Sequence, residues 1–332
     1  MEMLREREIG SSGMLLSNER RSTVKTRIIG NNHQLLRIDD EETNDLSEHT
    51  RNLFIAHCLE TIKRENPDVI IFEDYDKGVI SKPLIDAVTS AASAKNIPVT
   101  VDPKFRNFGN YTGVSLFKPN FGELLAGTGT KIDKRDTAAL QQIANKFMQG
   151  RNIALMMVTL SDAGVFITDG TQGEVIAAHV RDISDVSGAG DTVISVASLS
   201  LACGLSPQEV AMLANLAGGL VCEEIGVVPV NAIRFAEEAI KLILQDKEKL
   251  LSFGAYPEVT LAEARKRRDE AGDRRVTFGG VVTAPLGIDP KRRHDPHAGE
   301  LPGQVQERFP GHGRFHVHAG GDKSRPAVGT TA

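Results

Sequence analysis

Short runs of hydrophobic residues recur along the chain, and most of them end in polar side chains. The runs without alternation predict strands that are buried on both faces of a sheet, and they cover 68–74, 97–103, 114–120 and 153–160. Helical patterns between and after these runs predict helices over 45–66, 81–96, 120–127, 134–149, 190–203, 206–224 and 230–246. Alternating runs predict a hairpin over 24–39, which turns at Gly30, and an antiparallel pair over 164–170 and 173–180.

Strands that alternate with helices are typical of βαβ units, so we expect an α/β fold with a doubly wound, mostly parallel sheet. Helices should cover both faces of this sheet, and the hairpin should form a small β lid. Ligands of such sheets bind beyond the carboxyl ends of the strands. Polar residues follow the predicted strands there, and we expect them to gather at one edge: Glu73, Asp74, Asp102, Lys104, Lys118, Asn120, Thr159, Ser161 and Gly164.

The two ends of the chain lack a hydrophobic period. We expect a disordered segment over 1–23, which is polar and charged, and a disordered tail over 279–332, which is rich in Gly, Pro and His. The spacing of His312, His316 and His318 matches no closed metal site, which disfavours a metal function for the tail.

The composition excludes several classes of function. A net charge of −5 and the lack of a long basic run in residues 1–250 argue against a nucleic-acid partner. No stretch approaches the roughly 18 apolar residues of a membrane-spanning helix, so no membrane partner is expected. The three cysteines form no C-x-x-C pair and indicate a reduced, cytoplasmic protein.

The stretch DVSGAGDTVIS, residues 185–195, places small residues directly before a predicted helix. Gly188, Ala189 and Gly190 leave the unpaired N–H groups of the helix start accessible to an anion. A purely structural alternative is a glycine-rich helix start in which Asp191 favours the helix dipole. The helix behind it is small and apolar all round, so we expect it to be buried. This burial and the polar strand ends favour the functional interpretation.

Phosphoryl transfer is the chemistry that these groups would serve. Backbone N–H groups of Ala189, Gly190 and Asp191 would stabilise charge on the transferred phosphoryl group. The Asp191 carboxylate would accept the proton of an attacking hydroxyl group. The sequence contains neither a G-x-x-x-x-G-K-[ST] loop nor the H-R-D and D-F-G motifs of protein kinases. A dinucleotide-binding dehydrogenase is disfavoured as well, because no G-x-G-x-x-G follows an early strand.

The stretch DVSGAGDT resembles the second signature of the ribokinase-like (PfkB) sugar kinases, and KPNFGE resembles their Asn-x-x-Glu motif. Further stretches, among them DYDKG and VDPKFRNFGNYTGVSLFKPN, resemble the kinase half of the bifunctional heptose-7-phosphate kinases/heptose-1-phosphate adenylyltransferases of lipopolysaccharide synthesis. The resemblance covers about 23–245 and implies a ribokinase-like kinase domain over 24–246. It also implies ATP, Mg²⁺ and transfer of a phosphoryl group to the 1-hydroxyl of D-glycero-D-manno-heptose 7-phosphate.

The resemblance further implies a role for each matching residue. Asp191 would be the base, and the anion hole would consist of Gly188, Ala189 and Gly190. The nucleotide and its phosphates would contact Thr159, Ser161, Gly164, Asn215, Asn120 and Glu123. The sugar phosphate would contact Arg37, Asp74, Asp102 and Lys104. Glu123 would position Mg²⁺, and Asp185 would lie beside a metal site for a monovalent cation.

Structural alternatives remain open for some of these assignments. Asn215 would otherwise pack or cap a helix, and Lys104 would otherwise be a surface charge after a strand. Arg37, together with Gln34, would otherwise belong to the exposed face of the hairpin.

Two departures from the family pattern lead to further expectations. Residues 1–23 lack the sugar-binding aspartate and the Gly-Gly-Ala-x-Asn segment with which such kinases normally begin, so we expect a kinase domain that is incomplete at its N-terminus. Residues 247–278 resemble a linker and the start of a nucleotidyltransferase domain, which 279–332 do not continue. Two alternative functions therefore stay open: another PfkB kinase acting on a fructose phosphate or a nucleoside, and an inactive nucleotide-binding remnant. The expected partner is a small sugar phosphate, and a homodimer is kept open.

Overall fold

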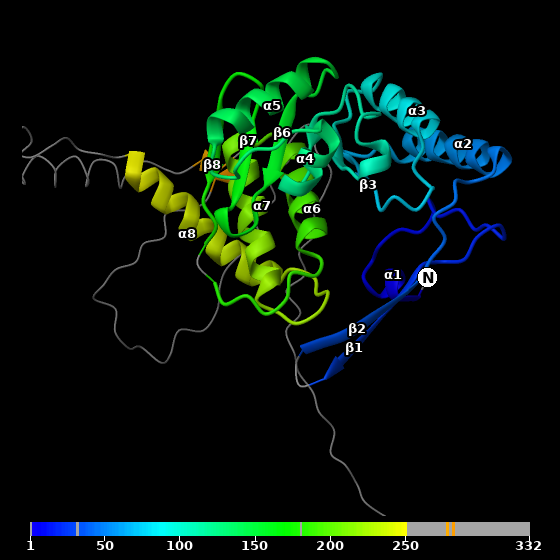
Figure 1. The fold of residues 1–332 in the computed structure, drawn as a ribbon, viewed down its shortest axis with the longest axis horizontal. Coiled ribbons are helices and arrows are strands. Elements are labelled where there is room, and N and C mark those ends of the chain that lie inside the picture. Colours follow the sequence, from blue (N-terminus) through cyan, green and yellow to red (C-terminus); the bar gives the residue numbers. More distant parts are fainter. Residues whose placement is uncertain (1, 31–32, 180, 251–276, 279–280, 283–332) are drawn as a thin grey trace, which may run out of the picture. The chain divides into compact units, whose positions relative to one another are not determined.

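The computed structural model describes residues 2–30, 33–179, 181–250, 277–278 and 281–282. Its centre is a six-stranded sheet with the strand order β3-β4-β5-β6-β7-β8 (Figure 1). The strands are β3 (Ile70–Glu73), β4 (Val99–Asp102), β5 (Leu116–Phe117), β6 (Leu155–Thr159), β7 (Val165–Thr168) and β8 (Gly173–Ile176). The first four of them pair in parallel, and β7 and β8 add an antiparallel pair at one edge. Both features agree with the predicted fold class, although the strands are shorter than the hydrophobic runs.

Helices cover both faces of this sheet, which confirms the predicted doubly wound architecture. They are α2 (Glu48–Glu65), α3 (Lys82–Ser93), α4 (Phe121–Thr128), α5 (Thr137–Gln149), α6 (Ala189–Ala202), α7 (Pro207–Cys222) and α8 (Ala232–Leu250). Alternate residues of β6 point to opposite faces. Met156 and Val158 belong to a core with residues of α3 and α5, whereas Leu155 and Met157 belong to a core with residues of α6 and α7. Burial of apolar side chains on both faces therefore holds the sheet between two helical layers.

Local signals set several helix boundaries. The α7 helix begins at a capping box between Ser206 and Glu209, and Pro207 occupies its first helical position. The α2 helix ends at Asn66, which adopts a left-handed conformation with a φ of 44° directly before Pro67. These boundaries lie within a few residues of the predicted ones.

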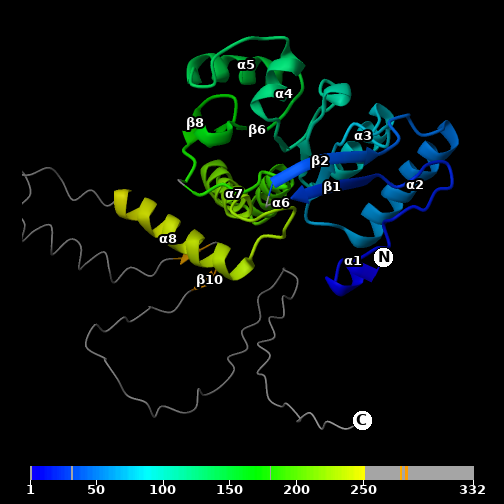
Figure 2. The same cartoon turned by 60° about the horizontal axis from the view of Figure 1, so that its bottom comes forward.

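The predicted hairpin consists of β1 (Val24–Gly30) and β2 (His33–Asp40), which pair antiparallel with a bulge between Ile28 and Ile29 (Figure 2). Most of its described side chains are exposed. Lys25 contacts the main part of the fold, because its ammonium nitrogen lies 5.4 Å from the centre of the Tyr75 ring.

The N-terminal segment differs from the expectation of a disordered stretch over 1–23. Residues Glu2–Glu6 form the short helix α1. The Arg20 guanidinium donates hydrogen bonds to the carbonyl oxygens of Glu42 and Lys77. This segment has no hydrophobic period, and it gains structure through polar contacts with other segments.

The α6 helix is not buried all round, so that expectation is wrong. Ile194 and Ala197 are buried, whereas Leu199 is 61% exposed and Ser195 is exposed as well. The helix packs on the sheet and on α7, and the remaining line of its surface is open. Although every side of α6 is apolar, not every side is in contact with another part of the described fold.

The predictions for the C-terminal part fall mostly outside the described residues, which exclude 251–276, 279–280 and 283–332. Within the spans of the expected linker and tail, the short strand β9 (Thr277–Phe278) pairs antiparallel with β10 (Val281–Val282).

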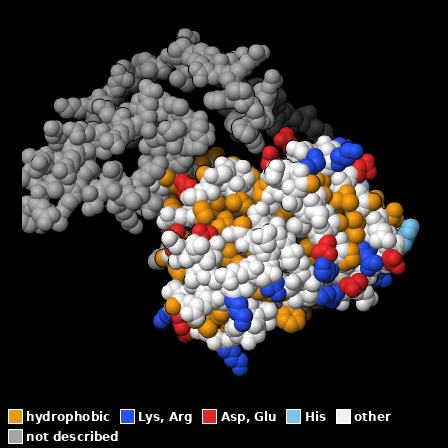
Figure 3. Space-filling view, turned by 90° about the horizontal axis from the view of Figure 1, so that it is seen from above, with side chains coloured by type: hydrophobic (Ala, Val, Ile, Leu, Met, Phe, Trp, Pro, Cys, Tyr) orange, Lys and Arg blue, Asp and Glu red, His pale blue; other side chains and the backbone are white. Residues whose placement is uncertain are grey.

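The described surface carries large hydrophobic side chains at several positions, including Leu16, Leu35 and Ile233. Figure 3 shows such side chains beside charged ones on one face of the molecule. Among the helices that the structure describes, none is long and apolar enough to cross a membrane.

Candidate active site

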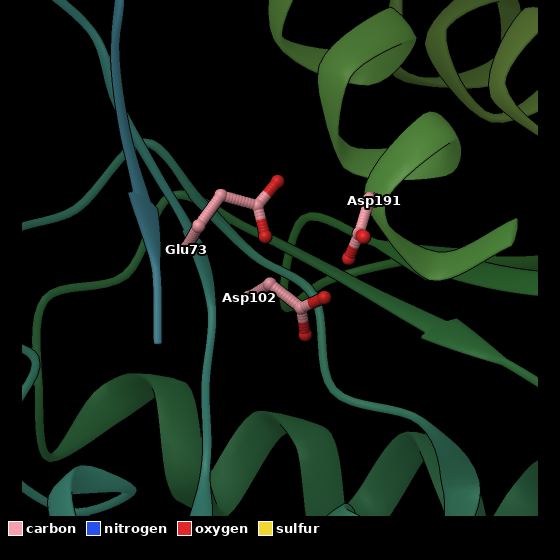
Figure 4. A group of neighbouring side chains, drawn as sticks. All are labelled: Glu73, Asp102 and Asp191. Carbon is pink, nitrogen blue, oxygen red and sulfur yellow. The ribbon is translucent and has the colours of Figure 1, made fainter. Parts of the chain in front are cut away.

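Three carboxylate side chains converge where β3, β4 and α6 meet (Figure 4). Glu73 and Asp102 are register partners at the ends of parallel strands, so their side chains share one face of the sheet. Asp191 faces them from the first turn of α6. One oxygen atom of each residue lies within 4.8 Å of the others. The structure thus brings Asp191 together with two of the polar strand-end residues that were expected to gather at this edge, Glu73 and Asp102.

One member of this carboxylate cluster, Asp102, forms a buried ion pair with Lys118. The Lys118 ammonium nitrogen is 3.0 Å from Asp102 Oδ2, and the two side chains are only 3% and 8% exposed. Burial raises the pKa of Asp102, and the nearby Lys118 and Lys104 charges oppose that shift. The other oxygen, Asp102 Oδ1, is buried without a hydrogen-bond partner among the described residues. The sequence placed Lys118 at a strand end, but nothing in it signalled this burial.

Glu123, which was predicted to position Mg²⁺, is engaged within the fold. Its Oε1 pairs with the Lys104 ammonium group, and its Oε2 accepts a hydrogen bond from the Asn120 backbone N–H at 2.8 Å. The Asn120 side chain caps the Glu123 N–H in return, which completes a capping box for α4. Mg²⁺ therefore does not fit the Glu123 carboxylate in this arrangement. Lys104 is 35% exposed at its side chain and pairs with Glu123, so the alternative of a surface charge after a strand stays open.

The Asp191 carboxylate is oriented by a tyrosine. The Tyr75 hydroxyl group donates a hydrogen bond of 2.8 Å to Asp191 Oδ2. Burial and this hydrogen bond raise the pKa of Tyr75, so the phenol stays protonated and remains a donor. Because Oδ2 is engaged, Asp191 Oδ1 is the oxygen that remains for an incoming group. Tyr75 had no role in the sequence analysis.

The glycine-rich turn before α6 has the predicted open geometry. Gly188 adopts a left-handed conformation with a φ of 80°, which strains any residue with a side chain. A Cβ atom on Gly190 would lie 3.7 Å from Asp102 Oδ2 and 3.9 Å from the Lys118 ammonium nitrogen. The absence of side chains therefore keeps the space between the turn and the buried ion pair free.

Asp185 ties two loops together. Its Oδ1 accepts the Ser187 N–H and its Oδ2 accepts the Gly226 N–H, each at 3.0 Å. These hydrogen bonds, first of all the one from Ser187, hold the pKa of Asp185 below its usual range. The predicted cation beside Asp185 stays a prediction.

Asp74 lies beside the cluster in sequence but has a different environment. Its carboxylate is buried and accepts hydrogen bonds from the Tyr111 hydroxyl at 2.9 Å and from Asn107 Nδ2 at 3.1 Å. Its second oxygen accepts the Asp76 N–H at 2.8 Å. Three donors satisfy this carboxylate, so the geometry assigns Asp74 to holding the chain around it. Its predicted contact with the sugar phosphate has no support in these partners.

The residues predicted to contact the nucleotide lie around the end of β6 and on α7. Thr159 forms an isolated parallel bridge with Asn120, and Ser161 follows in a short helical turn. Gly164 has a φ of 97°, and a Cβ atom there would lie 2.0 Å from the Ile176 carbonyl oxygen. The Asn215 side chain donates a hydrogen bond of 2.9 Å to the Ala177 carbonyl oxygen. Gly164 and Asn215 thus have packing roles in the described structure, and their nucleotide contacts stay predictions.

A cavity of about 1170 Å³ opens beside Asp191 and extends under the hairpin. Its lining includes Tyr75, Gly188 and two cations of β1, Lys25 and Arg27. Arg37, the hairpin cation predicted to bind the sugar phosphate, is absent from this lining and pairs with Asp39 at 2.9 Å. Lys25 and Arg27 are two residues apart on a strand and therefore share a face. This spacing was the signal in the sequence that could have found them. The side chain of Gln34 lies outside the described set.

The sequence is similar to bifunctional HldE proteins. It is 32% identical to the protein of Sulfurimonas denitrificans over 71% of this chain and 49% of that protein, and 37% identical to the protein of a Caulobacter species over 67% and 44%. The chain thus spans about half the length of the curated relatives that it matches.

The fold is similar to solved kinase structures. The tetrameric inhibited form of phosphofructokinase-2 from Escherichia coli superposes with a TM-score of 0.59, at 16% identity, over 73% of this chain and 76% of that one. A profile of the pfkB family carbohydrate kinases matches residues 1–233, which include the segment before the hairpin. Because this profile matches most of the chain and the fold is ribokinase-like, the chain belongs to the pfkB family of carbohydrate kinases.

Proposed function

We propose that this protein transfers the γ-phosphoryl group of ATP to a hydroxyl group of a sugar phosphate. The observation that carries the proposal is the position of Asp191. It lies in the first turn of α6, directly after a turn with the glycines Gly188 and Gly190, and it borders a cavity lined by the cations Lys25 and Arg27. Membership of the family supports phosphoryl transfer to an alcohol acceptor.

The residues of the chain divide the work of the transfer. Asp191 Oδ1 accepts the proton of the acceptor hydroxyl, and Tyr75 fixes the carboxylate through Oδ2. The Ala189 N–H already donates to the Val186 carbonyl oxygen at 3.3 Å. Within the described hydrogen bonds, the Gly190 and Asp191 N–H groups remain to stabilise negative charge on the transferred phosphoryl group.

The acceptor that we propose is heptose 7-phosphate, phosphorylated at its 1-hydroxyl group. Support comes from the HldE relatives and from the heptose-type motifs around Tyr75 and Asp102. The 7-phosphate of this acceptor lies away from the hydroxyl group that is phosphorylated, so it needs cations at a distance from Asp191. Lys25 and Arg27 line the hairpin side of the cavity. In kinases, Mg²⁺ neutralises the nucleotide phosphates. Both Glu123 oxygens are engaged, one by Lys104 and the other by the Asn120 N–H, so this carboxylate is not available to Mg²⁺ in this arrangement.

The test is phosphoryl transfer from ATP, measured as ADP release, with heptose 7-phosphate, fructose 6-phosphate and a nucleoside as acceptors. Asp191→Asn should lower kcat by about 10²–10⁴-fold and change ATP affinity little, because the variant removes the proton acceptor. Asp86→Asn, an exposed position on α3, is the matched control and should keep wild-type turnover.

Other outcomes identify the alternatives. Turnover of fructose 6-phosphate or of the nucleoside, without turnover of the heptose, would assign another PfkB substrate. ATP binding without transfer to any acceptor would support an inactive nucleotide-binding remnant.

A further inference from the structure

The charges around the carboxylate cluster do not balance. Lys118 pairs with Asp102, and Lys104 pairs with Glu123. Among the described residues, neither a hydrogen bond nor an ion pair reaches the Glu73 carboxylate. Glu73 and Asp191 therefore form a couple of like charges that face each other across the gap between β3 and α6 (Figure 4).

The groups around Glu73 come from β4, α6 and α2, from the loops that follow β3, β4 and β5, and from the hairpin. The charged and titratable groups that face it or line the adjoining cavity are Tyr75, Asp102, Lys104, Lys118, Asp191, Lys25, Arg27, Cys58, Glu65, Asp74 and Lys77. Burial, followed by the negative charges of Asp102 and Asp191, raises the pKa of Glu73 to about 7. The charge of Glu73 therefore changes close to neutral pH.

We propose that Glu73 is a positioning residue whose negative charge faces Asp191, so that proton uptake by Asp191 relieves the repulsion between the two carboxylates. The inference rests on the proposed function. In the transfer, the acceptor oxygen forms a bond to the γ-phosphorus and its proton moves to Asp191. The bond from that phosphorus to the bridging oxygen breaks, and ADP leaves with the electron pair. Protonation of Asp191 removes one of the two like charges, so the repulsion is relieved as the reaction proceeds.

A purely structural role for Glu73 would predict a different response to substitution. The Gln side chain has the same shape and would fill the same place between β3 and α6. If Glu73 only fills space, Glu73→Gln leaves the pH dependence of turnover unchanged. If Glu73 acts through its charge, the same variant changes that dependence.

The first experiment compares the pH profiles of kcat for wild type, Glu73→Gln and the control Glu60→Gln, which lies on the exposed face of α2. Wild-type kcat should rise as Glu73 ionises, with a midpoint near 7. Glu73→Gln should lose this rise and have a kcat about 10-fold lower above neutral pH, with KM little changed. A Glu73→Gln profile equal to that of wild type would overturn the proposal.

The second experiment needs no turnover. The ¹³C resonances of the glutamate carboxyl groups are titrated, and Glu73→Gln identifies the Glu73 signal by its disappearance. Asp191→Asn should lower the titration midpoint of Glu73, because it removes a neighbouring negative charge. An unchanged midpoint would show that the two carboxylates do not interact and would overturn the proposal. If wild type phosphorylates no acceptor, the proposed function fails, whereas this titration still decides whether Glu73 and Asp191 are coupled.

Discussion

The Lys118 ammonium group and Asp102 Oδ2 lie 3.0 Å apart in a part of the site where both side chains are almost fully buried. Charges removed from water to this extent depend on each other, because among the described residues neither has another partner of opposite charge as close. This pair forms the floor of the site, because it lies next to Gly190 in the turn before α6.

Removal of one partner should be far more damaging than removal of both charges. Lys118→Met leaves the Asp102 carboxylate buried without its cation and should lower the free energy of unfolding by about 3–5 kcal/mol. The double variant Lys118→Met/Asp102→Asn should recover a large part of that loss. Urea unfolding of wild type, both single variants and the double variant measures the coupling. Simple additivity of the two single effects would contradict a coupled pair.

The stability of the protein should fall as pH rises toward neutrality because of Glu73. Its pKa is 4.5 in an ordinary environment and about 7 in the fold, so the unfolded chain loses this proton first. The contribution of protonated Glu73 to stability is complete below pH 4.5 and is lost as pH rises through 7.

The variant Glu73→Gln cannot ionise and should not show this loss. After allowance for solvent screening of a partly exposed group, we expect it to be about 1–2 kcal/mol more stable than wild type near pH 8. Near pH 5 the two proteins should differ little. Urea unfolding at both pH values, with Glu60→Gln as control, checks the sign. A variant that is less stable than wild type at the higher pH would contradict the assignment.

Two tyrosines should respond differently to loss of their hydroxyl groups. Tyr75→Phe removes the hydrogen bond to Asp191 Oδ2 and should lower kcat by about 10-fold, because a hydrogen bond to a charged group contributes about 1.5–3 kcal/mol. Tyr111→Phe removes a buried hydrogen bond to Asp74 and should lower the free energy of unfolding by about 1–3 kcal/mol. Turnover and urea unfolding of both variants separate the two effects. An equal loss of kcat in both variants would contradict a specific effect of the Tyr75 hydroxyl group on turnover.

Substitution of the hairpin cations tests whether the sugar phosphate binds to Arg37, as the sequence predicted, or to Lys25 and Arg27, which line the cavity. Lys25→Ala and Arg27→Ala should each raise KM for the sugar phosphate by about 10-fold, because each removes a charge from the cavity. Arg37→Ala should leave KM unchanged, since its guanidinium pairs with Asp39 outside the lining. A rise of KM in Arg37→Ala alone would restore the prediction made from the sequence.

The layout of the sheet could be predicted because its signals are local. Hydrophobic runs without alternation indicate strands covered on both faces, and Met156 and Leu155 indeed enter opposite cores. The same lack of alternation hides which face an individual residue occupies. For that reason the sequence could not tell that Glu73 faces Asp191 while Asp74 is enclosed by Tyr111 and Asn107.

Side-chain partners across long distances in sequence were not predictable either. The pairing of Lys104 with Glu123 depends on the packing of α4 against the short helical turn Phe105–Asn107, and no spacing rule reports it. The exposure of Leu199 depends on which neighbours α6 has, and its composition carries no such information. The motif around Asp191 could be interpreted from the sequence because a glycine-rich helix start exposes its N–H groups whatever its neighbours are.

The two hydrogen bonds of Asp185 have a mechanical consequence. One oxygen holds Ser187, just before the helix that carries Asp191, and the other holds Gly226 in the loop after α7. Because a carboxylate group is rigid, the Asp185 side chain links the two loops directly through its two oxygens. The position of the loop at Gly226 is therefore tied to that of the turn before α6, which carries Asp191.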